Sequence, residues 1–150
     1  QRNFQGYSTQ KNTDLFAFGV SSISSFGNAF FQNYKEISTY TSILQTNFLP
    51  IEKGYISNID DILIQNIISS LMCDLEIDFQ QFSQKHKIDF INIFENELST
   101  LASIFEEDNL IKITSQKLII NEIGRLLLRN IVMVFDRYIK KDNSIYSKTI

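Results

Sequence analysis

Two short segments near the start of the chain have the residue types of a ligand-binding loop. In the first, RNFQGYST at 2–9, the amide of Gln5 offers a donor and an acceptor beside Gly6, where a backbone can approach a ligand closely. In the second, Ile23 follows an apolar run at 15–18, so it stands just beyond the carboxyl end of a predicted strand. The alternatives are a turn amide for Gln5 and ordinary core packing for Ile23.

Two arginines lie on a segment with helical periodicity near the end of the chain. At 100° per residue, Arg125 and Arg129 share a polar arc, and an apolar set lies opposite: Leu127, Leu128, Ile131, Phe135, Tyr138 and Ile139. A guanidinium fork binds carboxylates in bidentate geometry, so either arginine could face an anionic ligand. The alternative is an amphipathic core helix whose arginines pair with carboxylates such as Glu122 and Asp136.

The chain has few residues that ligate metals. It contains one cysteine, Cys73, and one histidine, His86. A single thiol cannot form an internal disulfide or hold a zinc ion or an iron–sulfur cluster by thiolates alone. We expect His86, which lies between two lysines, to be a solvated surface histidine.

Composition narrows the classes of partner. The 150 residues are 43% hydrophobic, enough for one domain with a core, and the net charge is −3. Nonspecific binding to nucleic acid needs clustered Lys and Arg, so nucleic acid is a poor default partner. Apolar runs fall short of the about 20 residues that span a membrane, so we expect no membrane partner. The start at Gln1, without a leader, indicates a piece of a longer protein.

The first part of the chain combines one strand with one helix. Residues 15–18, ended by Gly19, predict a buried strand of the parallel type. A Ser-rich turn and an aromatic patch follow, and then a helix over about 34–44. The character changes near Pro50, where we place a domain boundary.

The second part predicts mainly helices and one hairpin. Ser57 and Asp60 predict a helix start, and Asp78 with Gln81 predicts a second. The expected elements are helices to Met72, over 78–85 and over 89–105, strands over 110–114 and 118–120, and a final helix capped by Asn121. This order is typical of a winged-helix-like unit. DNA binding is disfavoured because the candidate recognition helix carries Glu95 and Glu97.

Three segments, RNFQGYST, DLFAFGVSSISSFGN and GRLLLRNIVMVFDRYI, in this order and spacing resemble the C-terminal third of the oxygen-independent coproporphyrinogen III oxidases. These are radical S-adenosylmethionine enzymes of heme synthesis. The resemblance implies a mainly α (α+β) fragment. Residues 1–48 would be the last segment of the (β/α) radical-SAM barrel, and residues 49–150 a helical, winged-helix-like domain with a small β-hairpin.

The resemblance also implies a chemistry. The full-length enzyme would oxidatively decarboxylate two propionates of coproporphyrinogen III to vinyl groups, giving protoporphyrinogen IX. It would use S-adenosylmethionine and a four-iron, four-sulfur cluster whose cysteine motif lies outside this chain. Gln5 and Ile23 match positions that contact S-adenosylmethionine in this family. A substrate with four propionates would suit Arg125 or Arg129 as its partner, and nothing in the sequence selects between the two.

Further expectations follow from the resemblance. No catalytic residue or metal ligand lies in this chain, so the isolated piece is expected to be inactive. The parent is expected to be a cytoplasmic monomer, and the unpartnered apolar strand would be a route to self-association of the piece. Two alternatives stay open. One is a heme-trafficking radical-SAM relative without oxidase activity, and the other is a free-standing interaction or nucleic-acid-binding winged-helix domain.

Overall fold

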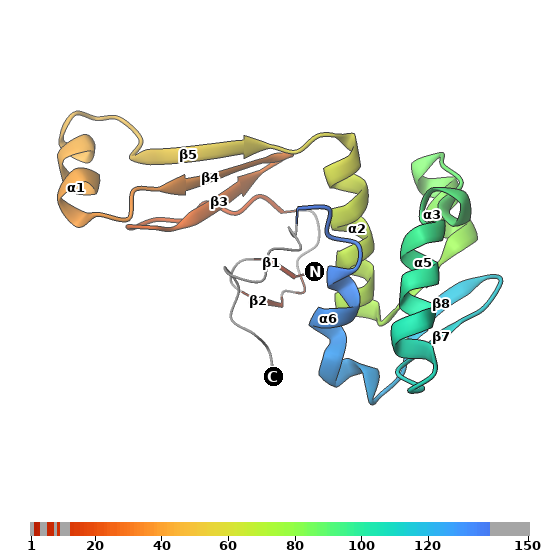
Figure 1. Ribbon diagram of the computed structural model, residues 1–150. Coiled ribbons are helices and arrows are strands. Elements are labelled where there is room, and N and C mark those ends of the chain that lie inside the picture. Colours follow the sequence, from red (N-terminus) through yellow and green to blue (C-terminus); the bar gives the residue numbers. More distant parts are fainter. Residues whose placement is uncertain (1, 4–5, 8, 10–12, 139–150) are drawn as a thin grey trace. The chain divides into compact units, whose positions relative to one another are not determined.

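The computed structural model describes residues 2–3, 6–7, 9 and 13–138 (Figure 1). The chain divides into two compact units, Gln1–Gln65 and Asn66–Ile150. The boundary predicted near residue 48 falls inside the first unit, between a helix and a strand, and that division of domains stays a prediction. None of the described helices is both long and apolar enough to cross a membrane.

A three-stranded antiparallel sheet forms the centre of the first unit. Its strands are β3 (Ile23–Phe26), β4 (Ala29–Asn33) and β5 (Ile51–Ile56), in the order β3-β4-β5 (Figure 1). The hairpin between β3 and β4 closes through two residues, of which Gly27 has φ 56°, a conformation that glycine adopts without strain. A small two-stranded sheet, β1 (Arg2–Asn3) with β2 (Gly6–Tyr7), precedes it.

The prediction of a buried parallel strand over 15–18 was wrong. Only Leu15 pairs with a strand, in an isolated antiparallel bridge to Ser25. The side chains of Phe16 and Phe18 are 59% and 90% exposed. A short apolar run does not reveal its own partner, and here the sheet pairs locally through the turn after β3, so the run remains outside it.

Helix α1 (Ile37–Gln45) connects β4 to β5 and confirms the helix predicted over 34–44. Its first turn is capped by the carboxylate of Glu36, which accepts hydrogen bonds from the backbone amides of Ser38 at 3.2 Å and Thr39 at 2.9 Å. The hydroxyls of these two residues also donate to Glu36. These bonds stabilise the carboxylate and lower the pKa of Glu36 to about 2.

Helix α2 (Ile59–Asp74) confirms the helix predicted to follow Ser57, with a different cap. The side chain of Asn58 accepts from the amide of Asp61 at 2.9 Å, and the carboxylate of Asp61 accepts from the amide of Asn58 at 2.9 Å. This reciprocal pair is a capping box one residue beyond the predicted start. Leu75, with φ 61°, follows the end of the helix.

The second unit combines helices with another three-stranded antiparallel sheet. Helix α3 (Phe79–His86) is followed by α4 (Phe90–Ile93) and by α5 (Glu95–Leu101), which continues as a π-helical turn to Glu106. The strands β6 (Glu76–Asp78), β7 (Ile111–Ile113) and β8 (Lys117–Ile120) have the order β6-β8-β7. The helix predicted over 78–85 and the hairpin are confirmed, and β6 is an additional strand. The single helix predicted over 89–105 is instead divided at Phe94 into α4 and α5 and ends in the π-helical turn.

Aromatic rings form the core of the second unit. Phe79 stacks on Phe90 with ring centroids 5.0 Å apart, and Phe90 contacts Phe94 at 4.9 Å. The ring of Phe94 then meets Phe135 edge-on at 5.9 Å. Phe90, Phe94 and Phe135 have no exposed surface, so these rings join α4 to the last described turns of the chain.

The prediction of one continuous final helix after Asn121 was wrong. The structure has a 3₁₀ turn, Gly124–Leu127, and then a short α6 (Leu128–Met133). The turn has no side-chain cap, and Asn121 instead donates its amide nitrogen to the carbonyl of Asn109 at 3.0 Å. The predicted burial of Ile131 and Phe135 is confirmed, whereas Leu127 and Tyr138 are 40% and 65% exposed. Ile139 and Lys140 lie outside the described residues.

Candidate functional site

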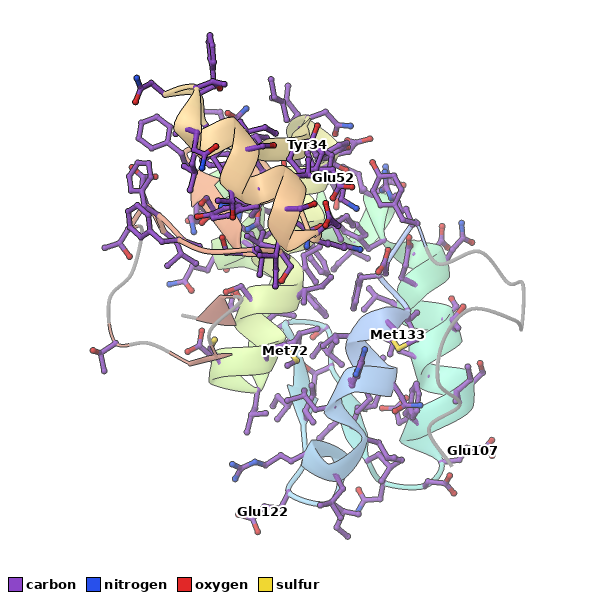
Figure 2. All side chains as sticks on the ribbon, turned by 90° about the vertical axis from the view of Figure 1, so that its left-hand side faces the viewer. Tyr34, Glu52, Met72, Glu107, Glu122 and Met133 are labelled. Carbon is purple, nitrogen blue, oxygen red and sulfur yellow. The ribbon has the colours of Figure 1, made fainter. Side chains whose placement is uncertain are left out.

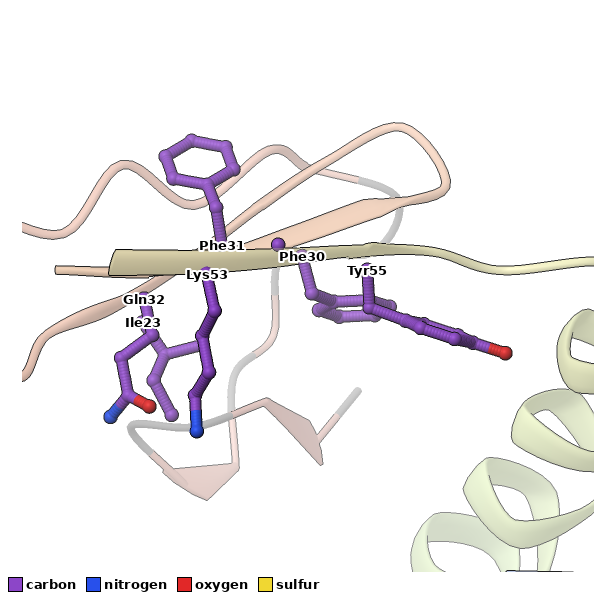
Figure 3. Close-up of a pocket in the computed structure, with 7 residues that line it drawn as sticks. Ile23, Phe30, Phe31, Gln32, Lys53 and Tyr55 are labelled. Carbon is purple, nitrogen blue, oxygen red and sulfur yellow. The ribbon is translucent and has the colours of Figure 1, made fainter. Parts of the chain in front are cut away.

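One face of the first sheet forms a hollow of about 200 Å³ around Ile23. The strand register places Ile23 of β3 opposite Gln32 of β4, and Gln32 opposite Lys53 of β5. Paired residues of neighbouring strands share a face, and Figure 3 shows these three side chains on the same side of the sheet. Phe30 and Tyr55, another opposed pair, continue the face, so five side chains from three strands line the hollow.

The lining combines an apolar floor with one cation. Ile23 and Phe30 are half-buried, and Tyr55 is 49% exposed. The phenol of Tyr55 donates to the carboxylate of Asp61 at 2.5 Å, which fixes the direction of the ring. Lys53 is exposed beside these groups. Such a surface fits an amphipathic ligand that has an apolar body and a carboxylate.

Hydrogen bonds hold the loop that leads into Ile23. The carbonyl of Gly19 accepts from Asn33 Nδ2 at 3.0 Å and from Ser22 Oγ at 2.8 Å, and the amide of Gly19 donates to the hydroxyl of Tyr40 at 3.2 Å. Gly19 itself has φ 103°, which side chains with a Cβ rarely adopt. The loop is therefore tied to β4 and α1, and Ile23 starts from a fixed position.

The other predicted cofactor contact, Gln5, lies outside the described residues. Its neighbour Gly6 pairs with Asn3 across β1 and β2. The φ of Gly6 is 122°, a backbone conformation that glycine adopts readily and other residues rarely do. The structure therefore shows Ile23 in a hollow and leaves the contribution of Gln5 a prediction.

The two predicted arginines belong to the second unit. Arg125 lies on the 3₁₀ turn and Arg129 on α6, and both are exposed. Within the described part of the chain, the ion pair found is that of Lys117 with Glu76 at 3.0 Å, and neither arginine joins a carboxylate. The expected pairing of these arginines with Glu122 or Asp136 is therefore not observed.

The acidic groups of the second unit lie at its surface. Glu107 and Glu122 are exposed (Figure 2). Glu76 pairs with Lys117 and, by this hydrogen bond and its charge, raises the pKa of that lysine. In the residues that the structure describes, no three His, Cys, Asp or Glu side chains are grouped so as to hold a metal ion.

The prediction that His86 is a solvated surface histidine was wrong. Its ring packs against Phe82 with centroids 4.3 Å apart, and its Nε2 is buried without a hydrogen-bond partner among the described residues. Burial, and to a smaller degree the positive charge of Lys85, lower the pKa of His86. Residues four positions apart on a helix lie on the same face, so the ring of His86 lies over Phe82. The lysines on either side of His86 did not indicate this contact.

Sequence reasoning missed Lys53, Phe30 and Tyr55 as lining residues. The available signal was the Gly27-Asn28 pair between two short apolar segments, which is typical of a two-residue hairpin. A hairpin centred there would have put Phe30 on the same face as Ile23. The position of Lys53 depends further on a bulge in β5, where Glu52 is the extra residue between the pairs Gln32–Lys53 and Asn33–Ile51.

No protein-family model matches the chain. The chain is 36% identical, over 99% of its length, to an oxygen-independent coproporphyrinogen III oxidase of Synechocystis sp., and covers 33% of that protein. It is 35% identical over its whole length to the corresponding protein of Helicobacter pylori, covering 33%, and 37% identical to that of Thermostichus vulcanus, covering 46%.

A solved structure gives the same result for the fold. The structure of a coproporphyrinogen III oxidase from Escherichia coli, described as a radical SAM enzyme, superposes with a TM-score of 0.86 at 36% sequence identity. The match covers 91% of this chain and 31% of that one. The chain thus spans about a third of the length of the first curated relatives it matches. Its sequence identity to them is higher than that of proteins that share only a fold.

Proposed function

We infer that the chain is a piece of an oxygen-independent coproporphyrinogen III oxidase, a radical S-adenosylmethionine enzyme. The observation that carries this inference is the agreement of fold and sequence with the Escherichia coli enzyme, which extends over 91% of this chain. We propose that residues 1–48 belong to the end of the radical-SAM barrel domain and residues 49–150 to a winged-helix-like C-terminal domain, although β4 and β5 pair across that boundary.

The reaction is the oxidative decarboxylation of two propionates of coproporphyrinogen III to vinyl groups, giving protoporphyrinogen IX. Each propionate side chain loses one hydrogen atom from a methylene carbon, its carboxylate as carbon dioxide, and one electron, which leaves a vinyl group and balances the step. The electron passes to an acceptor outside this chain. We propose for the helical domain the role of an active-site cover in the full-length enzyme, because such a cover would exclude water from reactive species.

The hollow beside Ile23 is the part of this chain that meets the cofactor. Its apolar floor fits the adenine or methyl end of S-adenosylmethionine. The amide of Gln5, in the first segment, would supply a donor and an acceptor. When bound, S-adenosylmethionine and a four-iron, four-sulfur cluster supply the radical that removes the hydrogen atom. We place the cluster ligands in the part of the enzyme outside this chain, because Cys73 is a single thiol.

Arg125 and Arg129 are the candidates for binding the substrate. Their exposed guanidinium groups, which pair with no described carboxylate, suit the propionates of the tetrapyrrole. We place the enzyme in the cytoplasm as a monomer, without a nucleic-acid or membrane partner.

The test is anaerobic activity of the full-length parent with reconstituted cluster, S-adenosylmethionine and coproporphyrinogen III. We expect protoporphyrinogen from the wild type. We expect loss of cofactor turnover in Gln5→Ala and Ile23→Ala variants that remain folded. A matched control is Leu126→Ala, an exposed apolar residue of the second unit. A wild type that binds heme and never decarboxylates would contradict the oxidase function and favour the trafficking relative.

A further inference from the structure

Lys53 is the cation of the hollow that contains Ile23. It lies on β5, two strands away from Ile23 through Gln32, and the three side chains point to one side of the sheet (Figure 3). Neighbouring strands are about 4.8 Å apart, so the backbones of Lys53 and Ile23 are separated by roughly 10 Å. A lysine stem of four carbons bridges much of that distance, so one small ligand can meet both side chains.

The charge of Lys53 is not used within the part of the chain that the structure describes. The ion pair found there joins Lys117 to Glu76, and no described carboxylate pairs with Lys53. Gln32, its direct neighbour on the face, donates its side-chain amide to the carbonyl of Ser21 at 2.9 Å. The amide is thus engaged, and the ammonium group of Lys53 remains as the cation directed at the hollow.

The local backbone directs Lys53 to this face. The register between β4 and β5 shifts between Gln32 and Asn33, so that Glu52 is an extra residue in β5. A bulge of this kind changes which side of the sheet the neighbouring side chains face, and bulges are frequent beside functional sites. Without the extra residue, regular alternation from Ile51 would bring a different side chain beside Gln32.

We propose that Lys53 binds a carboxylate of the ligand whose apolar part rests on Ile23. This proposal rests on the proposed function, in which that ligand is S-adenosylmethionine or the tetrapyrrole substrate. Both carry the chemistry that Lys53 recognises. S-adenosylmethionine has one amino-acid carboxylate, and coproporphyrinogen III has four propionates. Lys53 is thus a ligand-binding residue that fixes the position of one carboxylate on the sheet.

The experiment compares the full-length parent, reconstituted anaerobically, with its Lys53→Gln and Lys53→Arg variants. Affinity for S-adenosylmethionine and for its decarboxylated analogue is measured by equilibrium dialysis, and affinity for coproporphyrin III by quenching of its fluorescence. The matched control is Lys112→Gln, an exposed strand lysine of the second unit. Circular dichroism melting establishes that each variant is folded.

We expect Lys53→Gln to lower the affinity for one of the two ligands by about ten-fold, which corresponds to the loss of a hydrogen bond to a charged group. We expect Lys53→Arg to retain most of the affinity. Loss for S-adenosylmethionine, but not for its decarboxylated analogue, identifies the cofactor carboxylate. Loss for coproporphyrin III alone identifies a propionate. Unchanged affinity for both ligands in folded Lys53→Gln overturns this proposal and leaves the proposed function intact. A wild type that binds neither ligand overturns the proposed function as well.

Discussion

The side-chain amide of Asn33 donates a 3.0 Å hydrogen bond to the carbonyl of Gly19, which lies fourteen residues earlier in the chain. The same amide donates to Ser22 Oγ at 3.0 Å, and Asn33 is only 7% exposed. A buried side chain at the end of β4 therefore holds the turn that precedes Ile23. The strand that carries Phe30 and Gln32 and the loop that positions Ile23 are one hydrogen-bonded assembly.

The first prediction concerns this amide. Replacing Asn33 by Ala removes both bonds and leaves the carbonyl of Gly19 with one donor fewer, so we expect the free energy of unfolding to fall by about 1–3 kcal/mol. Urea unfolding followed by circular dichroism measures the loss, and hydrogen exchange should become faster at the amide of Gly19. The matched control is Gln45→Ala, an exposed amide at the end of α1. Equal stability of the Asn33 and Gln45 variants would contradict the role of Asn33.

The second prediction concerns Gly124, which is buried at the start of the 3₁₀ turn. A Cβ built there would lie 2.0 Å from the carbonyl oxygen of Leu110 and 3.0 Å from Ile120 Cγ2. Backbone must move to admit it, so we expect Gly124→Ala to lower the free energy of unfolding by about 2–3 kcal/mol.

The control for Gly124 is Leu126→Ala on the same turn, where the side chain is 85% exposed. We expect a change of less than about 0.5 kcal/mol at this surface position. Chemical denaturation of both variants under one set of conditions makes the comparison. A Gly124→Ala protein as stable as Leu126→Ala would show that the turn relaxes away from Leu110 without cost.

The third prediction concerns the cap of α1. The pKa of Glu36 is lowered to about 2, chiefly by hydrogen bonds from the hydroxyls of Ser38 and Thr39, from its ordinary value of 4.5. The unfolded chain takes up the proton first as the pH falls, so the stabilisation by this carboxylate is complete above about pH 4.5 and disappears as the pH falls through about 2. Between pH 6 and pH 2, the free energy of unfolding should fall more in the wild type than in Glu36→Gln. If the free energy of unfolding changed with pH in the same way in both proteins, the Glu36 cap would not contribute to the pH dependence.

Local signals in the sequence were sufficient for several elements. Asp78 and Gln81 predict the start of α3, and the structure has the carboxylate of Asp78 accepting from the amide of Gln81 at 2.8 Å. The hairpin of β7 and β8 follows in the same way from a polar turn between two short apolar runs. Helix caps and hairpin turns depend on residues within a few positions of one another, so the local sequence is enough to predict them.

The features that were missed depend on distant partners. The apolar run at 15–18 has no periodicity that distinguishes a buried strand from an exposed segment, and its fate depends on which strands pair. Lys53 reaches the hollow only through the register of β4 with β5 and the bulge at Glu52. The final helix is interrupted where Gly124 packs on Leu110, a contact between segments fourteen positions apart that periodicity does not contain.

The fourth prediction concerns His86, the one histidine of the chain, whose ring is packed on Phe82. Burial and then the charge of Lys85 lower its pKa below 6.5, so the unfolded chain binds a proton at a higher pH than the folded chain does. The stability associated with the neutral ring is therefore complete above about pH 6.5 and is lost as the pH falls through the folded pKa.

A proton NMR titration of the single imidazole measures that pKa directly. In His86→Phe, which keeps a ring on Phe82 and removes the proton, the free energy of unfolding should fall less between pH 7 and pH 5 than in the wild type. An imidazole pKa at or above 6.5 would show that the ring is hydrated and that Nε2 finds a partner in solution.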